Sequence, residues 1–186
     1  MTTITTEFGT LTGTYTFDPA HSRIGFVARH AMVTKVRGAF NEFEGTATID
    51  GDEPGKSSAR VTLQVASIDT RNAQRDGHLR TNDFLDAENY PQITFVSTEV
   101  EHVGGADFEV TGDLTIKDVT RSVTIPLEFQ GAATDPFGNQ RIGFEGSLPI
   151  NRSDFGVTYN AALETGGVLV SDKITLEFEI SAIKTD

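Results

Sequence analysis

Alternating apolar and polar residues mark the stretch from residue 107 to residue 130. From Phe108 to Ile116 every second residue is apolar or glycine, and the residues between them are Glu, Thr and Asp. After the mostly polar segment 117–121 the same period of two resumes and continues to Gln130. A period of two is typical of β-strands that have one buried face and one hydrated face. The pattern therefore predicts a β-hairpin with one apolar face, and the function depends on what lies against that face.

Similar alternation runs along most of the chain. It predicts further strands at 11–17, 23–29, 36–49, 59–68, 93–101, 141–150 and 173–183. The stretch 36–49 changes phase near Asn41 and Glu42, which predicts a bulge or turn there. The polar segment 70–82 has no strand pattern, and we expect it to form one short helix across an end of the sheet. The segment 131–140, which contains Asp135-Pro136 and Gly138-Asn139, is predicted to be a long loop.

These elements predict an all-β fold. We expect a single extended antiparallel β-barrel of about eight strands, because most connections are short and closure removes exposed strand edges. The barrel domain is assigned to residues 11–186, and residues 1–10, which are rich in Thr, are expected to form a flexible N-terminal arm.

Composition excludes several classes of function. The chain has 27 acidic and 15 basic side chains and a formal charge of -12, which argues against nucleic-acid binding and disfavours anionic membranes. No run of eighteen apolar residues occurs, so stable membrane insertion is not expected. The absence of cysteine excludes disulfides and thiolate chemistry. The N-terminus lacks the basic flank and apolar run of a secretory signal, so we expect a cytoplasmic protein.

The interior of an eight-stranded barrel is either filled by side chains or holds one small ligand. Glycines recur in phase with Phe and Ile at positions 13, 38, 45, 112 and 146. Small residues on an inward face either permit strand bending or leave a cavity, and the sequence leaves both readings open. A cavity lined by Phe, Ile, Leu and Val would select a long uncharged chain, because a polar ligand would lose its hydration without gaining hydrogen bonds.

Five segments carry specific motifs: residues 15–30, 36–45, 75–97, 112–120 and 152–156. They resemble the motifs of the YceI-like family of polyisoprenoid-binding, lipocalin-like proteins, and the resemblance extends from about residue 15 to residue 183. It implies a lipocalin-like barrel whose apolar interior holds a long-chain isoprenoid, an isoprenoid quinone or a fatty-acid-like amphiphile. No covalent chemistry is implied, and no cofactor other than the bound lipid. Many relatives are exported with a signal peptide, which this sequence lacks.

The resemblance and the alternation together give the candidate ligand-binding residues. Some stand in the shared motifs and the others on predicted inward faces; the set is Phe17, His21, Phe26, His30, Phe40, Phe43, Phe84, Phe95, Leu114, Phe129, Phe144, Phe155 and Phe178. No catalytic residue and no metal site is expected, because the histidines lack zinc-motif spacing and no nucleophile elbow is present.

Several polar residues have two readings. His21, beside Asp18, suits a head-group anchor or a local cap of the Asp18-Pro19 turn. His30 suits either a contact at the cavity mouth or a structural role. The helical residues Arg75, Asp76 and His78 suit local ion pairing, and Arg152 and Asp154 suit a loop-fixing pair.

The leading hypothesis is a non-enzymatic protein that binds, sequesters or transports an apolar lipid. One alternative is a protein-interaction or stress-related module with a filled or vestigial cavity, and a homodimer is compatible with either reading. A third hypothesis, an enzyme acting on a lipid, would need a buried polar constellation around His21, His30 or Asp154.

Overall fold

The computed structural model describes residues 8–163 and 169–186. The strands are β1 (Gly13–Phe17), β2 (Arg23–His30), β3 (Thr34–Phe40), β4 (Phe43–Ile49), β5 (Ser58–Gln64), β6 (Ile68–Asp69), β7 (Gln92–Gly104), β8 (Asp107–Ile116), β9 (Val119–Thr134), β10 (Gln140–Asn151) and β11 (Lys173–Lys184). The helix is α2 (Ala73–Leu79), and the short 3-10 turns are η1 (Pro19–His21), η2 (Pro54–Lys56), η3 (Val65–Ser67) and η4 (Arg152–Phe155).

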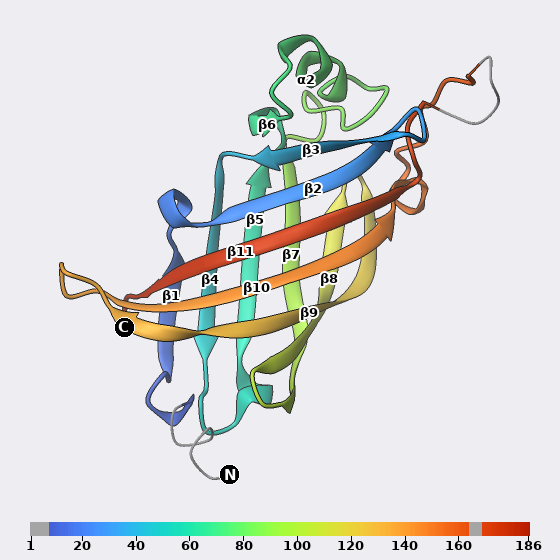
Figure 1. Cartoon of the computed structure of the whole chain (residues 1–186). Helices are drawn as coiled ribbons and strands as arrows, with labels where there is room; N and C mark the ends of the chain where they lie inside the picture. The colour runs from blue at the N-terminus through green and yellow to red at the C-terminus, as the bar shows by residue number, and fades with distance from the viewer. Residues whose placement is uncertain (1–7, 164–168) are drawn as a thin grey trace.

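The strands form a closed antiparallel barrel of eight strands, as the sequence predicts (Figure 1). The ring runs through β1, β4, β5, β7, β8, β9, β10 and β11, and it closes because β1 pairs with both β4 and β11. β2 and β3 extend the wall beyond β1 and β4, since β2 pairs with the N-terminal part of β11 and β3 with β2 and β6. Figure 1 shows α2 at this extended end of the barrel.

The hairpin predicted at 107–130 is confirmed by the pairing of β8 with β9. The register runs continuously from Asp107 opposite Glu128 to Ile116 opposite Val119. Val110, Leu114 and Ile116 are buried on the inner face of β8, while Glu109 and Asp113 are exposed. The predicted change of phase near Asn41 is also confirmed, because β3 ends at Phe40 and β4 begins at Phe43.

The predicted loop at 131–140 is wrong over half of its length. β9 continues to Thr134 and β10 begins at Gln140, so only a tight turn separates them. Asp135 organises that turn by accepting hydrogen bonds from the backbone N–H groups of Phe137 and Asn139. The small residues Ala132 and Ala133 pair with β10, and their weak hydrophobic pattern concealed the strand from periodicity.

The predicted helix is confirmed in a shorter form, with Asn72 as its N-cap residue. Asp76 anchors α2 to the end of β6, because its carboxylate accepts hydrogen bonds from both the backbone N–H and the hydroxyl of Thr70. Arg75 also donates to Thr70, through Nε to the hydroxyl at 2.7 Å and Nη2 to the carbonyl at 2.7 Å. The expected local ion pairing of Arg75 with Asp76 is therefore replaced by convergence of both side chains on Thr70.

Residues 1–7 of the predicted N-terminal arm lie outside the described residues, and Phe8 differs from the expectation. Its side chain is buried, and its ring packs edge-on against His102, Phe108 and Phe129 at centroid distances of 5.4–5.5 Å. Phe8 therefore belongs to the barrel core. No helix of the described residues is long and apolar enough to cross a membrane.

Candidate ligand-binding cavity

Within the described residues, the barrel holds a large cavity of about 250 Å³ and a smaller one of about 120 Å³. A buried apolar cavity of about 150 Å³ is already enough to hold benzene. The large cavity occupies the end near α2, and the small cavity occupies the end near η2. The wall of both is almost entirely apolar, so neither offers hydrogen bonds that would replace the hydration of a polar ligand.

The alternation of inward and outward residues along the strands determines which side chains form this wall. On β2, Ile24, Phe26 and Ala28 face the large cavity, while the flanking Arg23 and Arg29 lie outside it. β8 and β11 contribute their inward residues in the same way. The wall is thus the hydrophobic face that the sequence pattern predicts, and the core packs around a hollow centre.

A ring of residues borders both cavities: Phe17, Ala59, Val110, Leu127 and Ile180. They come from five different strands and form the boundary between the two volumes. Phe17 carries the largest side chain of this set. The two cavities therefore adjoin near the level of Phe17.

Two glycines explain how aromatic rings fit into the wall. A Cβ atom on Gly45 would overlap the ring of Phe17, and one on Gly38 would overlap the ring of Phe26. Each ring thus lies directly against the backbone of a neighbouring strand, as in the aromatic covering of strand glycines. At these positions glycine allows a ring to approach the backbone closely. This is a third role, beside the strand bending and the cavity that the sequence left open.

A cluster of three aromatic rings lies at the end of the large cavity next to α2. His78, Phe84 and Tyr159 pack edge-on against one another at centroid distances of 5.1–5.2 Å. The His78 Nε2 atom lies 2.8 Å from the Asp83 carboxylate, which fixes the imidazole on the outer side of the cluster. Because Phe84 lies in the cavity wall, this cluster joins α2 to the segment after η4 across the end of the barrel.

Arg152 is the charged residue in the wall of the large cavity, and it is only 7 % exposed. Its guanidinium donates hydrogen bonds to the carbonyls of Ser171 at 2.9 Å, Val157 at 2.8 Å and Val170 at 3.3 Å. Burial lowers the pKa of this guanidinium, and the nearby Asp172 carboxylate acts in the opposite direction. Arg152 therefore ties the irregular segments around it together.

Eight of the predicted ligand-binding residues lie in the wall of the large cavity: Phe17, Phe26, Phe40, Phe84, Phe95, Leu114, Phe155 and Phe178. Phe129 and Phe144 lie in the wall of the small cavity, which Phe17 also borders.

The three other candidates lie elsewhere. His21 is on the surface, where its Nδ1 atom lies 2.7 Å from the Asp18 carboxylate, so the local capping interaction is the one that the structure contains. His30 is exposed at the end of β2 and pairs through its backbone with Val170. Phe43 is buried in the core opposite Leu63, outside the cavity wall.

The expected pairing of Arg152 with Asp154 is replaced by other contacts. Arg152 binds backbone carbonyls, and the carbonyl of Asp154 accepts a hydrogen bond from Arg121 at 2.7 Å. Both residues still fix the local loop. Sequence reasoning also missed Phe8, Leu79, Arg152 and Val157 as wall residues. They belong to segments without a period of two, and only Leu79 and Arg152 stand in the shared motifs, at 75–97 and 152–156.

An ionic cluster lies outside the cavities, where η1 meets β10. Arg141 binds the Asp18 carboxylate at 2.7 Å and the Asp135 carboxylate at 2.8 Å. The hydrogen bond from Arg141 lowers the pKa of Asp18, with His21 adding to the effect. Burial acts to raise the pKa of Asp135, but hydrogen bonds from Arg141 and from the turn residues lower it overall.

Residues 15–182 match the YceI-like domain. The chain belongs to the YceI-like family. Among YceI-like relatives, a UPF0312 protein of Staphylococcus epidermidis is 40% identical over 171 residues, covering 90% of this chain and 95% of the relative. A UPF0312 protein of Staphylococcus aureus is 38% identical over 169 residues, with the same coverage of 90% and 95%.

Several solved structures superpose on this YceI-like barrel. BcnA of Burkholderia cenocepacia superposes with a TM-score of 0.78 at 30% identity, covering 89% of this chain and 98% of that protein. A YceI protein of Campylobacter jejuni gives a TM-score of 0.72 at 30% identity, covering 85% and 90%. A polyisoprenoid-binding domain from Saccharophagus degradans gives 0.69 at 16% identity, covering 91% and 98%, and this likeness shows the shared fold.

Proposed function

We propose that this chain binds one long apolar ligand inside the barrel, without covalent chemistry, and sequesters or carries it through water. The ligand is an isoprenoid, an isoprenoid quinone or a fatty-acid-like amphiphile. The observation that carries the proposal is the pair of adjoining apolar cavities, which share the boundary around Phe17. Membership of the YceI-like family and the fold shared with a polyisoprenoid-binding domain support it. We infer a cytoplasmic site of action.

Hydrocarbon transfer supplies the binding free energy. Each methylene moved from water into the cavity contributes about 0.8 kcal/mol. About ten methylenes contribute about 8 kcal/mol, the free energy of a dissociation constant near 1 µM, before the cost of ordering the chain. Selectivity then depends on the length and shape of the cavity, because the wall has almost no polar groups.

The placement of the polar residues supports the non-enzymatic part of the proposal. His21 and His30 lie before and at the end of β2, about 20 Å or more apart at the rise of a strand. Asp154 lies in η4 and is exposed. These residues do not converge on the cavity as a lipid-directed enzyme would need.

Native mass spectrometry of the purified chain tests the proposal, followed by titration of the delipidated protein with a fluorescent C16 fatty acid and with a prenol. We expect co-purified lipid and saturable 1:1 binding. Ala28→Leu and Ala59→Leu add volume to the cavity wall and should each weaken binding by about tenfold or more. Thr46→Leu, at an exposed position on β4, is the matched control and should bind like the wild type.

Folded protein that retains no lipid and shows no saturable binding of either probe would overturn the proposal. Circular dichroism and thermal melts of each variant separate loss of binding from loss of folding.

A further inference from the structure

The segment 19–41 differs in charge from the rest of the chain. It contains Arg23, Arg29, Lys35 and Arg37 but no acidic residue, although the whole chain has 27 acidic and 15 basic side chains. Most of this segment forms β2 and β3. A concentration of positive charge on an acidic protein indicates a local surface whose electrostatic behaviour differs from that of the whole molecule.

The register of β2 and β3 places three of these cations on one outer face. Arg29 lies opposite Lys35, and Arg37 lies opposite Val27, so their side chains share the face that points away from the cavity. Arg23 is paired with Glu177 at 3.1 Å. Within the described part of the chain, no carboxylate lies within ion-pair distance of Arg29, Lys35 or Arg37. Like charges placed directly opposite each other are unfavourable, and an anionic partner would relieve the repulsion.

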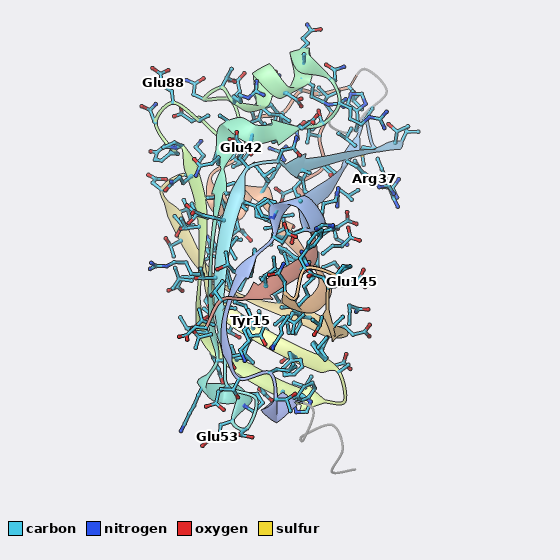
Figure 2. All side chains as sticks on the ribbon, turned by 90° about the vertical axis from the view of Figure 1, so that its left-hand side faces the viewer. Tyr15, Arg37, Glu42, Glu53, Glu88 and Glu145 are labelled. Atoms are coloured by element: carbon cyan, nitrogen blue, oxygen red, sulfur yellow. The ribbon has the colours of Figure 1, made fainter. Side chains whose placement is uncertain are left out.

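The turn between the two strands is apolar and exposed. Met32 is 61 % exposed and Val33 is 75 % exposed. The backbone makes the turn through Ala31 and Met32, which both have positive φ angles. We call residues 27–37 the basic hairpin: a two-stranded ribbon with cations on its outer face and two apolar side chains at its tip. Figure 2 shows Arg37 at the periphery of the molecule, on the part of β3 that projects from the barrel.

The basic hairpin borders the end of the large cavity. Ala28 on β2 and Val170 both line that cavity, and Val170 pairs with His30 at the base of the turn. Ser171 strengthens this junction, because its hydroxyl accepts a hydrogen bond from the backbone N–H of Arg29. A surface bound by the hairpin would therefore lie beside the end of the cavity that the YceI-like barrel closes with α2 and η4.

We propose that the basic hairpin docks the barrel onto a bilayer that contains anionic phospholipid headgroups. The cations bind the headgroup phosphates, and Met32 and Val33 enter the headgroup region. Each basic side chain near such a surface strengthens binding by about fivefold. The net charge of -12 does not prevent docking, because at physiological salt charges are screened beyond about 8 Å. Two acidic neighbours are already engaged: the Asp172 carboxylate by the Ser153 hydroxyl and backbone N–H, and Glu177, opposite Gly25, by Arg23.

A bilayer fits the hairpin better than a protein partner does. A specific protein interface needs about 800 Å² from each partner, whereas this tip offers two adjacent apolar side chains on a narrow ribbon. Shallow insertion of a few apolar groups beside basic side chains is the pattern of peripheral membrane binding. Docking serves to exchange the ligand at the membrane. This role rests on the proposed function, whereas the docking itself does not.

Vesicle co-sedimentation of the full chain tests the proposal with two compositions, pure phosphatidylcholine and a mixture with about a third phosphatidylglycerol. We expect binding to the anionic vesicles that weakens steeply with salt, and little binding to phosphatidylcholine. Lys35→Gln with Arg37→Gln should weaken binding about 25-fold. Arg29 is kept in this variant because its guanidinium contacts the Val33 carbonyl. Val33→Ser should weaken binding about tenfold through loss of apolar insertion.

Lys56→Gln with Arg60→Gln, which removes two exposed cations near η2 and β5, is the matched control and should bind like the wild type. Equal binding to both vesicle types, no binding to either, or unchanged binding of the Lys35 and Arg37 variant would overturn the proposal. Titration with the fluorescent fatty acid in the absence of vesicles separates the two proposals. The hairpin variant should bind the fatty acid normally, and Ala59→Leu should dock to vesicles normally.

Discussion

The ring of Phe17, at the end of β1, lies against the backbone of Gly45 on β4 at the point where a Cβ atom would stand. Since Phe17 also borders both cavities, the missing side chain at Gly45 determines where the division between them lies. The contact between the Phe17 ring and the Gly45 backbone thus influences the shape of the whole interior.

Gly45→Ala should move Phe17 into the cavities. The added methyl group overlaps the ring, and overpacking of this kind costs about 1–3 kcal/mol in the free energy of unfolding. Urea unfolding should show this loss, and fatty-acid titration should show weaker binding. Gly55→Ala is the control, because the nearest atom to a Cβ at that position is the Val100 carbonyl oxygen at 3.6 Å. A Gly45→Ala protein as stable as the control would contradict the expected overlap.

Phe17→Leu should partly join the two cavities. The shorter side chain opens the boundary, so we expect the affinity for a C20 chain to rise relative to that for a C12 chain. We expect this substitution to lower the free energy of unfolding by about 1 kcal/mol. Titration with the two chain lengths measures the ratio, and an unchanged ratio would show that the ligand does not pass the level of Phe17.

Arg152→Lys should destabilise the end of the barrel by about 2 kcal/mol or more. A lysine cannot reproduce the three-carbonyl geometry of the guanidinium, and hydrogen bonds to charged groups contribute about 1.5–3 kcal/mol. Urea unfolding gives the loss, and Arg60→Lys, at an exposed position on β5, should leave stability unchanged. Equal stability of the two variants would assign Arg152 a role other than fixing the loops.

Arg141→Gln should reduce the acid sensitivity of the fold. The folded-state pKa values of Asp18 and Asp135 are lowered, so their contribution to stability is present above about pH 4 and is lost as the pH falls toward those values. Without Arg141 the pKa values lie nearer to those of the unfolded chain. The urea midpoint should therefore fall less between pH 7 and pH 3 than in the wild type. Lys56→Gln, which breaks an exposed ion pair with Glu53, should change at pH 3 as the wild type does.

The barrel could be predicted from sequence because its walls are built from local alternation. β8 and β9 are regular over their whole pairing, and the inward residues of this hairpin form part of the cavity wall. A period of two tells which side chains share a face, so it places Phe26, Phe95 and Leu114 on the inward face. It does not tell whether the interior is hollow, because that depends on how the opposite walls meet.

The ends of the barrel could not be predicted in the same way. Phe8 precedes the first strand and Val157 follows η4, so both reach the cavities from segments without periodicity. His21 and His30 stand in shared motifs, yet they lie at the ends of β2, where local hydrogen bonds and exposure determine the side-chain position. Nearness in sequence to inward-facing residues is therefore a weak guide to contact with the cavity.

The pairing of β1 with β11 joins residues near the start of the chain to residues near its finish, such as Tyr15 opposite Lys184. During synthesis on the ribosome, β1 cannot pair with β11 until nearly the whole polypeptide has been made. The seam of the barrel therefore forms after translation of β11, and contacts so distant in sequence form slowly. The apolar interior is therefore sealed from water on this side only once the C-terminal strand is in place.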